Sequence, residues 1–216
     1  MIVHRMGERA LLVEVEDGAA AQALHAECVR RRAAGVLVAE EIVPGARTVL
    51  LDGIGGTGGI EAPRQADGFG VEALARSLPR WRIPPVETAG GPRVEIPVIF
   101  DGPDVADVAR HWGVGAGDVG RIVTSTELTV AFCGFAPGFA YLGGLGREVP
   151  RRETPRTAVP TGAVGLAGEY AGVYPRRSPG GWQIIGTAVD VLLWDVAREP
   201  AALLAPGTRV RFVEAP

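Results

Sequence analysis

Glycine and proline recur at high density between residues 134 and 183, and no other feature constrains the backbone of this chain as strongly. They are interleaved with aromatic residues and arginines in three runs: GFAPGFAYL from Gly134, VPRRETPR from Val149 and RRSPGGWQ from Arg176. Glycine permits, and proline enforces, backbone angles that other residues avoid, so these runs specify turns. Such turns hold particular side chains beside one another, which a plain core segment would not require.

The hydrophobic pattern of the second half is that of a β domain. A strand-like run at 94–100 opens it, and helices are predicted at 103–112 and 117–124, the first capped by Asp101 or Asp104 and the second by Asp118 or a neighbour. After Leu128 the apolar runs are short and separated by turns, ending with 208–213. Many short strands with frequent turns indicate a barrel or a sandwich.

The first 84 residues predict a different domain. Their expected order is strand, helix, strand, strand, helix, strand, with the clearest elements at 10–15, 19–34, 36–43, 48–51 and 71–78. That order matches a small ferredoxin-like α/β sandwich. Together the two patterns predict an α+β protein with an N-terminal α/β domain at 1–84, a proline- and glycine-rich linker at 85–93 and a β domain at 94–216.

Composition excludes several kinds of chemistry. All 22 basic residues are arginine, and the chain contains neither lysine nor asparagine, which excludes a P-loop lysine, a Schiff-base lysine and a Cys-His-Asn triad. The net charge of -3 argues against a nucleic-acid partner. Neither a membrane-spanning apolar run nor a secretory signal is evident, so we expect a cytoplasmic protein without a membrane partner. Cys28 and Cys133 lack metal-site spacing, so we expect no metal.

Several motifs allow both a functional and a structural interpretation. Six arginines fall within residues 147–177 beside only three acidic residues, so they could bind a carboxylate or phosphate, or equally form solvated loop ends. The glycines at 53–58 fit GxGxxG, but no helix is predicted to open there, which disfavours a dinucleotide site. Ser178 lacks a nucleophile elbow and a paired base. Tyr141, Tyr174 and Trp182 are better explained as barrel packing, although each carries a polar group.

The longest motifs resemble one family. GFAPGFAYLGGL at 134–145, VPRRETPRTAVPTGAVGLAG at 149–168 and VYPRRSPGGWQIIG at 173–186 are similar to the KipI/PxpB family, also named allophanate hydrolase subunit 1. The resemblance implies that the second domain is a cyclophilin-like β-barrel. It also implies a partner of the PxpC or allophanate hydrolase subunit 2 type and, in the 5-oxoprolinase system, a PxpA-type subunit.

The function implied by this resemblance is that of the B component (PxpB) of an ATP-dependent 5-oxoprolinase, which opens 5-oxo-L-proline to L-glutamate. We expect the chain to be inactive alone and ATP to be used by the complex, since the chain has no nucleotide motif. The first alternative is a carboxyltransferase subunit of the allophanate hydrolase subunit 1 type, acting with biotin on urea or a related small amide. The second is a KipI-like inhibitor of a histidine kinase.

The resemblance also points to individual residues. It implies catalytic roles for Arg156, Ser178 and Tyr174, and contacts to a small anionic or amide substrate from Arg151, Tyr141, Trp182 and Gly138. The chain departs from the family pattern at two places beside this predicted site. Ala163 stands where serine is common, and Ala171 ends a stretch that often ends in threonine. The loss of two hydroxyl groups there predicts an altered set of contacts to the substrate.

Overall fold

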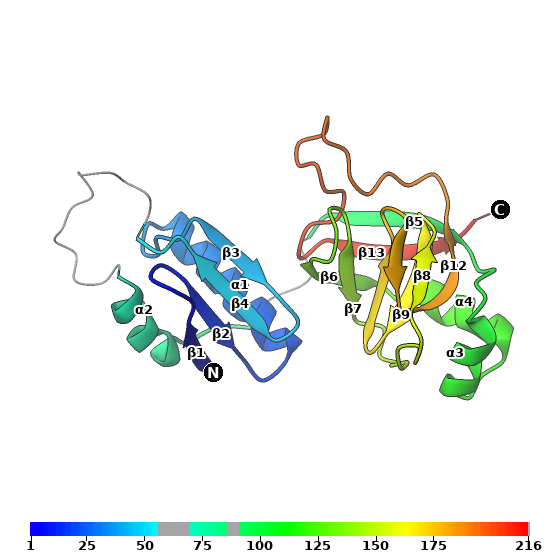
Figure 1. The fold of residues 1–216 in the computed structure, drawn as a ribbon, viewed down its shortest axis with the longest axis horizontal. Helices are drawn as coiled ribbons and strands as arrows, with labels where there is room; N and C mark the ends of the chain where they lie inside the picture. Colours follow the sequence, from blue (N-terminus) through cyan, green and yellow to red (C-terminus); the bar gives the residue numbers. More distant parts are fainter. Residues whose placement is uncertain (56–69, 86–90, 216) are drawn as a thin grey trace. The chain divides into compact units, whose positions relative to one another are not determined.

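The chain divides into two compact units, Met1–Glu87 and Thr88–Pro216 (Figure 1). The computed structural model describes residues 1–55, 70–85 and 91–215. Residues 86–90 of the predicted linker and residues 56–69, which include the end of the GxGxxG match, therefore lie outside the described residues.

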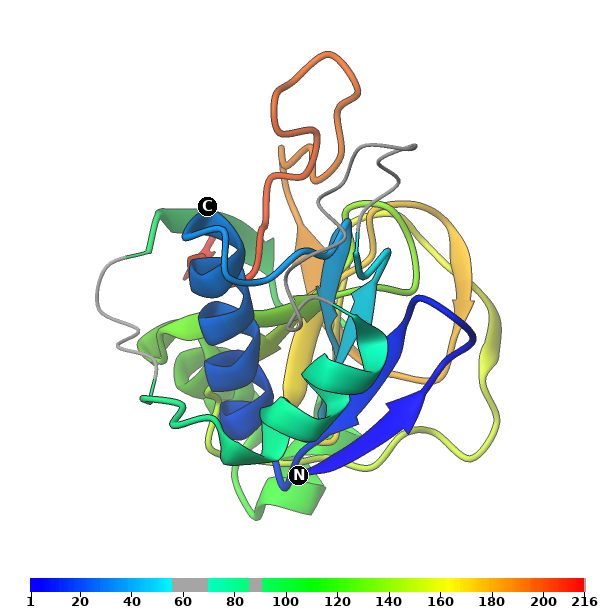
Figure 2. The same cartoon turned by 90° about the vertical axis from the view of Figure 1, so that its left-hand side faces the viewer.

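The first unit is an antiparallel sheet covered on one face by two helices. Its elements are β1 (Ile2–Arg5), β2 (Leu11–Glu14), α1 (Gly18–Ala33), β3 (Glu41–Pro44), β4 (Thr48–Asp52), α2 (Val71–Ser77) and the short 3-10 helix η1 (Leu78–Arg80). The strand order is β1-β2-β4-β3. Alternate strand residues such as Val13 and Val49 are buried in one core with Leu24 of α1 and Leu74 of α2. Figure 2 shows α1 running along this face of the sheet.

The element order of this unit differs from the predicted one. A strand precedes the first predicted strand, and the described residues after α2, up to Pro85, contain none. The edge beside β2 is filled by β1, which pairs with it from Ile2–Glu14 to Arg5–Leu11. Most of β1 is exposed, so its sequence carries no alternation of buried and exposed residues from which a strand could be predicted. The ferredoxin-like order is not confirmed.

The second unit is a closed seven-stranded barrel with the strand order β10-β7-β6-β13-β5-β12-β9, which settles the choice between barrel and sandwich. Its strands are β5 (Arg93–Ile99), β6 (Leu128–Cys133), β7 (Ala140–Gly143), β9 (Ala163–Ala167), β10 (Tyr170–Val173), β12 (Gln183–Ala188) and β13 (Arg209–Glu214). The pair β5 and β13 is parallel, whereas the other neighbours are antiparallel. A separate two-stranded sheet joins β8 (Arg156–Val159) to β11 (Ser178–Gly180).

Two helices pack beside the barrel, close to where they were predicted. They are α3 (Val105–Trp112), which contacts β12, and α4 (Ala116–Ser125), which contacts β13. The N-cap residue of α4 is Gly115, and Asp118 lies inside the first turn, where it accepts a hydrogen bond from the Gly115 amide at 3.0 Å. Asp104 occupies the N-cap position of α3, but its side chain makes no capping bond. Of the two predicted cap residues, Asp104 thus holds the cap position, but its side chain is engaged in the site described below.

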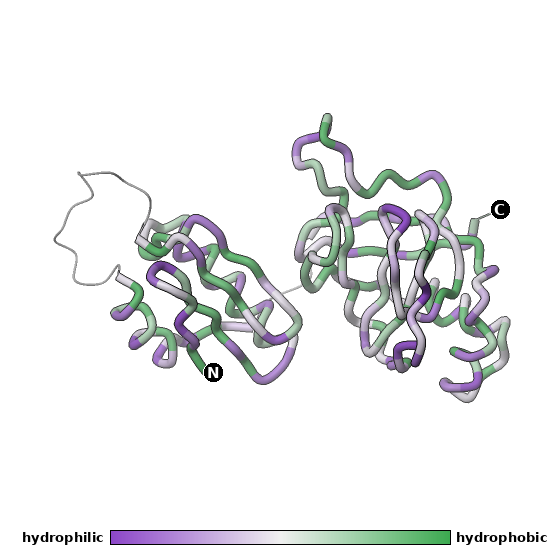
Figure 3. Tube along the Cα trace, viewed as in Figure 1, coloured by the Kyte–Doolittle hydropathy of each residue, from purple (hydrophilic) through white to green (hydrophobic). Residues whose placement is uncertain are grey.

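Glycines in the barrel strands leave room for aromatic side chains. A Cβ atom at Gly172 would lie 2.9 Å from the Phe139 ring, and one at Gly165 would lie 3.1 Å from the Cβ of Trp182. The first distance would force the ring to shift and the second is tighter than most Cβ contacts, so glycine at both positions lets the rings pack closely on the strands. Between β12 and β13 part of the chain projects from the barrel (Figure 1), and hydrophobic residues recur along it (Figure 3). Leu193 and Leu204 of this connection are buried in the barrel core.

Candidate functional site

A buried carboxylate joins the arginine-rich segment to the barrel. Asp104 is 2% exposed, and its Oδ1 accepts hydrogen bonds from Arg152 Nη1 at 2.9 Å and from Arg156 Nη2 at 2.8 Å. Its Oδ2 accepts from the backbone amide of Ile184 in β12 at 2.6 Å. The carboxylate is thus committed to three donors from two distant segments, which explains why it does not cap α3.

Two opposing effects act on the pKa of Asp104. Burial alone would raise this pKa, because a charged carboxylate is poorly solvated inside a protein. The hydrogen bonds from Arg156 and from the Ile184 amide, together with the charges of Arg156 and Arg152, outweigh burial and lower the pKa below its ordinary value. Asp104 is therefore ionised at neutral pH and holds both guanidinium groups in place.

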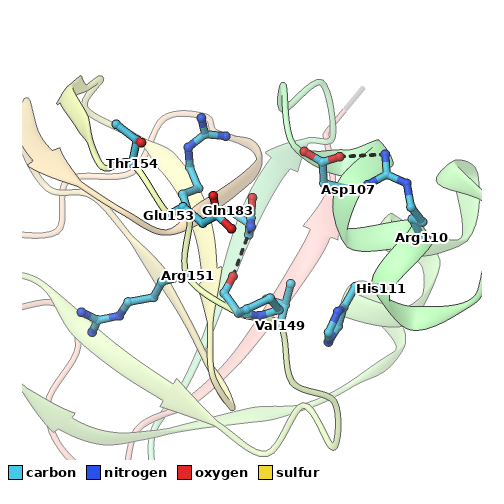
Figure 4. Close-up of a pocket in the computed structure, with 10 residues that line it drawn as sticks. Asp107, Arg110, His111, Val149, Arg151, Glu153, Thr154 and Gln183 are labelled. Carbon is cyan, nitrogen blue, oxygen red and sulfur yellow. Dashed lines mark hydrogen bonds and ion pairs between the residues drawn. The ribbon is translucent and has the colours of Figure 1, made fainter.

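A cavity of about 710 Å³ lies beside this ion network (Figure 4). Its lining comes from α3, from the segment 149–154 and from the start of β12: Asp107, Arg110, His111, Val149, Pro150, Arg151, Arg152, Glu153, Thr154 and Gln183. Arg110 is paired with Asp107 at 2.8 Å and Arg152 with Asp104, whereas Arg151 makes no ion pair within the described part of the chain. Arg151 is exposed and extends away from Asp107 and Arg110 in Figure 4.

The positive charge of Arg151 influences the pKa of two tyrosine hydroxyl groups. Burial raises the pKa of Tyr141 and of Tyr174, and the positive charge of Arg151 partly offsets that rise for both. Both phenols therefore stay protonated at neutral pH, so each can donate a hydrogen bond. The charge of Arg151 therefore acts on both phenols, two of the other residues predicted to contact substrate or take part in catalysis.

The same tyrosines belong to an aromatic cluster that packs on β7, β9 and β10. Tyr141 stacks on Phe132 with ring centroids 4.2 Å apart, and Trp182 meets Tyr141 edge-on at 5.5 Å. Phe139 lies 5.4 Å from both Tyr174 and Trp182. Trp182 is 6% exposed and Tyr174 is 2% exposed, so both serve the packing role that the sequence favoured.

Of the seven predicted site residues, Arg151 lines this cavity, and six lie outside its lining: Gly138, Tyr141, Arg156, Tyr174, Ser178 and Trp182. The Ser178 hydroxyl donates to the Arg176 carbonyl at 3.1 Å, within its own turn. Gly138 has φ +84°, and a Cβ there would lie 2.9 Å from the Cβ of Trp194. Gly138 lines a second hollow of about 430 Å³ formed by Cys133–Gly138, Trp194, Ala202 and Leu204. Arg156 is held by its hydrogen bond to Asp104.

The second hollow has an apolar rim. Phe135, at its edge, is 57% exposed and has φ +66°, a conformation that costs a non-glycine residue on the order of 1 kcal/mol. Trp194 is 40% exposed, and its neighbours Leu192 and Val196 are 60% and 86% exposed. Phe135 and Trp194 line the hollow, and together with Leu192 and Val196, the exposed sequence neighbours of Trp194, they are called the apolar rim below.

Residues 1–204 match the family described as the carboxyltransferase domain, subdomains C and D. Over 155 residues the chain is 41% identical to the 5-oxoprolinase B component of Escherichia coli O157:H7, which is 69% of this chain and 71% of that protein. The chain belongs to the KipI/PxpB family of carboxyltransferase domains.

In two solved structures of similar proteins, the region that matches this chain is part of a longer polypeptide. A crystal structure of TTHA0988 superposes with a TM-score of 0.69 and 33% identity, covering 96% of this chain but only 40% of that chain. The urea amidolyase of K. lactis shares the fold, with a TM-score of 0.68 at 18% identity over 99% of this chain and 15% of that one.

The sequence did not indicate the residues that line one side of the 710 Å³ cavity. Asp107, Arg110 and His111 were part of a predicted helix with no assigned function, and Asp104 was interpreted as a cap. Gln183 was visible at the end of the RRSPGGWQ run, but a glutamine after a turn carries no distinctive signal. Only the packing of α3 against β12 brings these residues to the segment 149–154.

The described residues contain neither a metal-binding cluster nor a membrane-spanning helix. No group of three or more histidine, cysteine, aspartate or glutamate side chains among them is arranged to hold a metal ion. None of the helices in residues 1–55, 70–85 and 91–215 is long and apolar enough to cross a membrane.

Proposed function

We propose that this chain is the B component of an ATP-dependent 5-oxoprolinase complex that opens 5-oxo-L-proline to L-glutamate. The observation that carries the proposal is the 41% identity to the 5-oxoprolinase B component of Escherichia coli O157:H7, across 71% of that protein. The chain contributes a binding surface and is inactive alone. ATP is used by the assembled complex, since no nucleotide motif is present in this sequence.

The reaction requires a group that neutralises negative charge beside a lactam. The lactam oxygen takes the γ-phosphoryl group of ATP, with ADP as the leaving group, and water adds to the activated carbon. Cleavage of the C–N bond frees the amine and leaves an acyl phosphate, from which a second water releases phosphate. Arg151, which has no ion pair in the described residues, suits the substrate carboxylate or the transferred phosphoryl group.

The other predicted site residues have different roles in this proposal, from hydrogen-bond donor to shaping a turn. Tyr141 and Tyr174 supply neutral phenol donors near Arg151, and Trp182 packs against Tyr141. Arg156 acts from the network around Asp104, where its Nη1 is buried without a hydrogen-bond partner among the described residues. The local hydrogen bond of Ser178 supports a role in shaping the turn rather than in nucleophilic attack.

We propose that a partner subunit covers the apolar rim of Phe135, Leu192, Trp194 and Val196. Large exposed apolar side chains gathered around a hollow are typical of protein interaction surfaces. In TTHA0988 the matching region makes up 40% of a longer chain, so a related barrel is joined to further polypeptide. The occupant is a PxpC-type subunit, and a PxpA-type subunit completes the complex. The complex works in the cytoplasm.

We also propose a fold relationship for each of the two units. The closed barrel of seven strands supports a cyclophilin-like fold for the second unit. The four-stranded antiparallel sheet with two helices on one face supports a ferredoxin-like relationship for the first, with β1 at the edge expected for a later strand.

A second candidate is a carboxyltransferase subunit that works with biotin on urea or another small amide. The carboxyltransferase description of the matching family is the observation that favours it. An uncharged amide substrate would not need Arg151 for a carboxylate, although a carboxylated intermediate would.

The deciding experiment measures glutamate released from 5-oxo-L-proline by this chain reconstituted with the subunits encoded beside it, omitting each protein and ATP in turn. The proposal expects glutamate only when every component is present. Glutamate formation that persists without this chain would refute it. Avidin-sensitive turnover of urea would favour the carboxyltransferase candidate, and stoichiometric inhibition of a histidine kinase by the chain alone would favour the regulatory one.

A further inference from the structure

Gln183 carries a buried acceptor without a partner. It is the first residue of β12 and is only 8% exposed. Its Nε2 donates to the Pro150 carbonyl at 3.1 Å, which fixes the amide orientation, because a carbonyl can only accept. Gln183 Oε1 is thereby turned away from Pro150 (Figure 4) and has no hydrogen-bond partner in the described part of the chain. Buried polar atoms of this kind are normally paired, so Oε1 is an open acceptor position that a water or a ligand donor can fill.

Arg152 carries a hydrogen-bond donor that is likewise buried without a partner among the described residues. Its Nη1 is held by Asp104, and its backbone amide donates to the Gly181 carbonyl at 2.8 Å, so both ends of the residue are fixed. The Nε of Arg152 is buried and has no partner within the described residues. Arg152 and Gln183 line the same 710 Å³ cavity. The cavity wall therefore contains one unpaired acceptor and one unpaired donor on rigidly held side chains.

We propose that Gln183 and Arg152 recognise a group in which an N–H lies beside a C=O, as in a lactam. Gln183 Oε1 accepts a hydrogen bond from the N–H, and Arg152 Nε donates to the C=O. A carboxylate or phosphate offers only acceptors, so it would leave Gln183 Oε1 facing another oxygen. The identification of the ligand as 5-oxo-L-proline rests on the proposed function, whereas the donor and acceptor pattern does not.

Gln183 Oε1 and Arg152 Nε lie below the surface of the cavity wall. Glu153 and Thr154 are exposed and line the cavity, while Oε1 and Nε are covered from solvent. Binding at the pair therefore includes a local rearrangement that uncovers both atoms. Arg151, on the neighbouring position, is then available for the substrate carboxylate.

The test compares two ligands that differ in one hydrogen-bond donor. Binding of 5-oxo-L-proline and of N-methyl-5-oxo-L-proline is measured by calorimetry on the reconstituted complex without ATP. Wild type is expected to prefer 5-oxo-L-proline by about tenfold or more, because the N-methyl compound leaves the buried acceptor unpaired. Gln183→Met, which keeps the length of the side chain and removes the acceptor, is expected to reduce this preference to about twofold or less.

The preference ratio separates recognition from stability, because a general loss of folding weakens both ligands equally. Thr154→Ala serves as the matched control in the same wall and should keep the wild-type ratio. Retention of the ratio in Gln183→Met would overturn the proposal, as would equal binding of both ligands or no binding of either to wild type. If the complex releases no glutamate but the ratio still collapses in Gln183→Met, the proposed function fails and the lactam subsite stands.

Discussion

Removing the carboxylate of Asp104 should destabilise the barrel far more than removing an exposed carboxylate of α3. In Asp104→Ala, Arg152 and Arg156 lose their common counter-ion, and the Ile184 amide loses its acceptor. Breaking a buried ion pair from one side costs about 3–5 kcal/mol, because the remaining charge stays poorly solvated. The arginine side chains are 31% and 24% exposed, so water partly solvates them, and we expect about 3 kcal/mol.

Asp107→Ala provides the matched control. Asp107 lies three residues away and pairs with Arg110, but the two side chains are 50% and 75% exposed. An exposed pair contributes about 0–1 kcal/mol, so this variant should unfold nearly like wild type. Hydrogen exchange of the Ile184 amide measures the effect locally, which matters because a chain of two units need not unfold in one transition. Ile184 should exchange on the order of 100-fold faster in Asp104→Ala.

Acid gives an independent check of the same reasoning. The pKa of Asp104 is lowered in the folded state, so its contribution to stability is present above about pH 4, the ordinary pKa of an aspartate. This contribution is lost as the pH falls through the lowered pKa. The difference in stability between wild type and Asp104→Ala should therefore shrink below pH 4. A difference from Asp107→Ala of less than about 1 kcal/mol at pH 7 would refute the buried-network argument.

Three further results are expected. Arg151→Ala should lower the turnover of the reconstituted complex at least tenfold while changing stability by less than about 0.5 kcal/mol, and unchanged turnover would exclude Arg151 from the site. Gly138→Ala should cost about 1–3 kcal/mol in urea unfolding, more than Gly146→Ala, because both have positive φ but only Gly138 would place a Cβ against Trp194. Burial, with the neighbouring acidic charge of Glu169, raises the pKa of Tyr170 to about 12, so absorbance titration of the folded protein should show no tyrosinate from it at pH 10.

Sequence by itself determined the local features of this protein. The helices at 105–112 and 116–125 fall close to the predicted ranges, because capping residues and apolar periodicity are local properties of the chain. The turn-rich second half narrowed its fold to a barrel or a sandwich, and the long motifs between 134 and 186 indicated the family. These motifs also included the arginine-rich segment. They did not indicate which of its arginines would form ion pairs with Asp104.

Only the tertiary structure decided how these segments meet. The sequence could not show that β1 forms a sheet edge, nor that β5 and β13 pair in parallel to close the barrel. It gave Asp101 or Asp104 as the cap of α3, and Asp104 holds that position, but the fold places its carboxylate beside arginines 48 and 52 residues later in the chain and an amide 80 residues later. Contacts at such separations leave no periodic trace in the sequence. The burial of Asp104 and the unpaired atoms of Gln183 and Arg152 therefore follow from the packing of α3 and the segment 149–156 against β12.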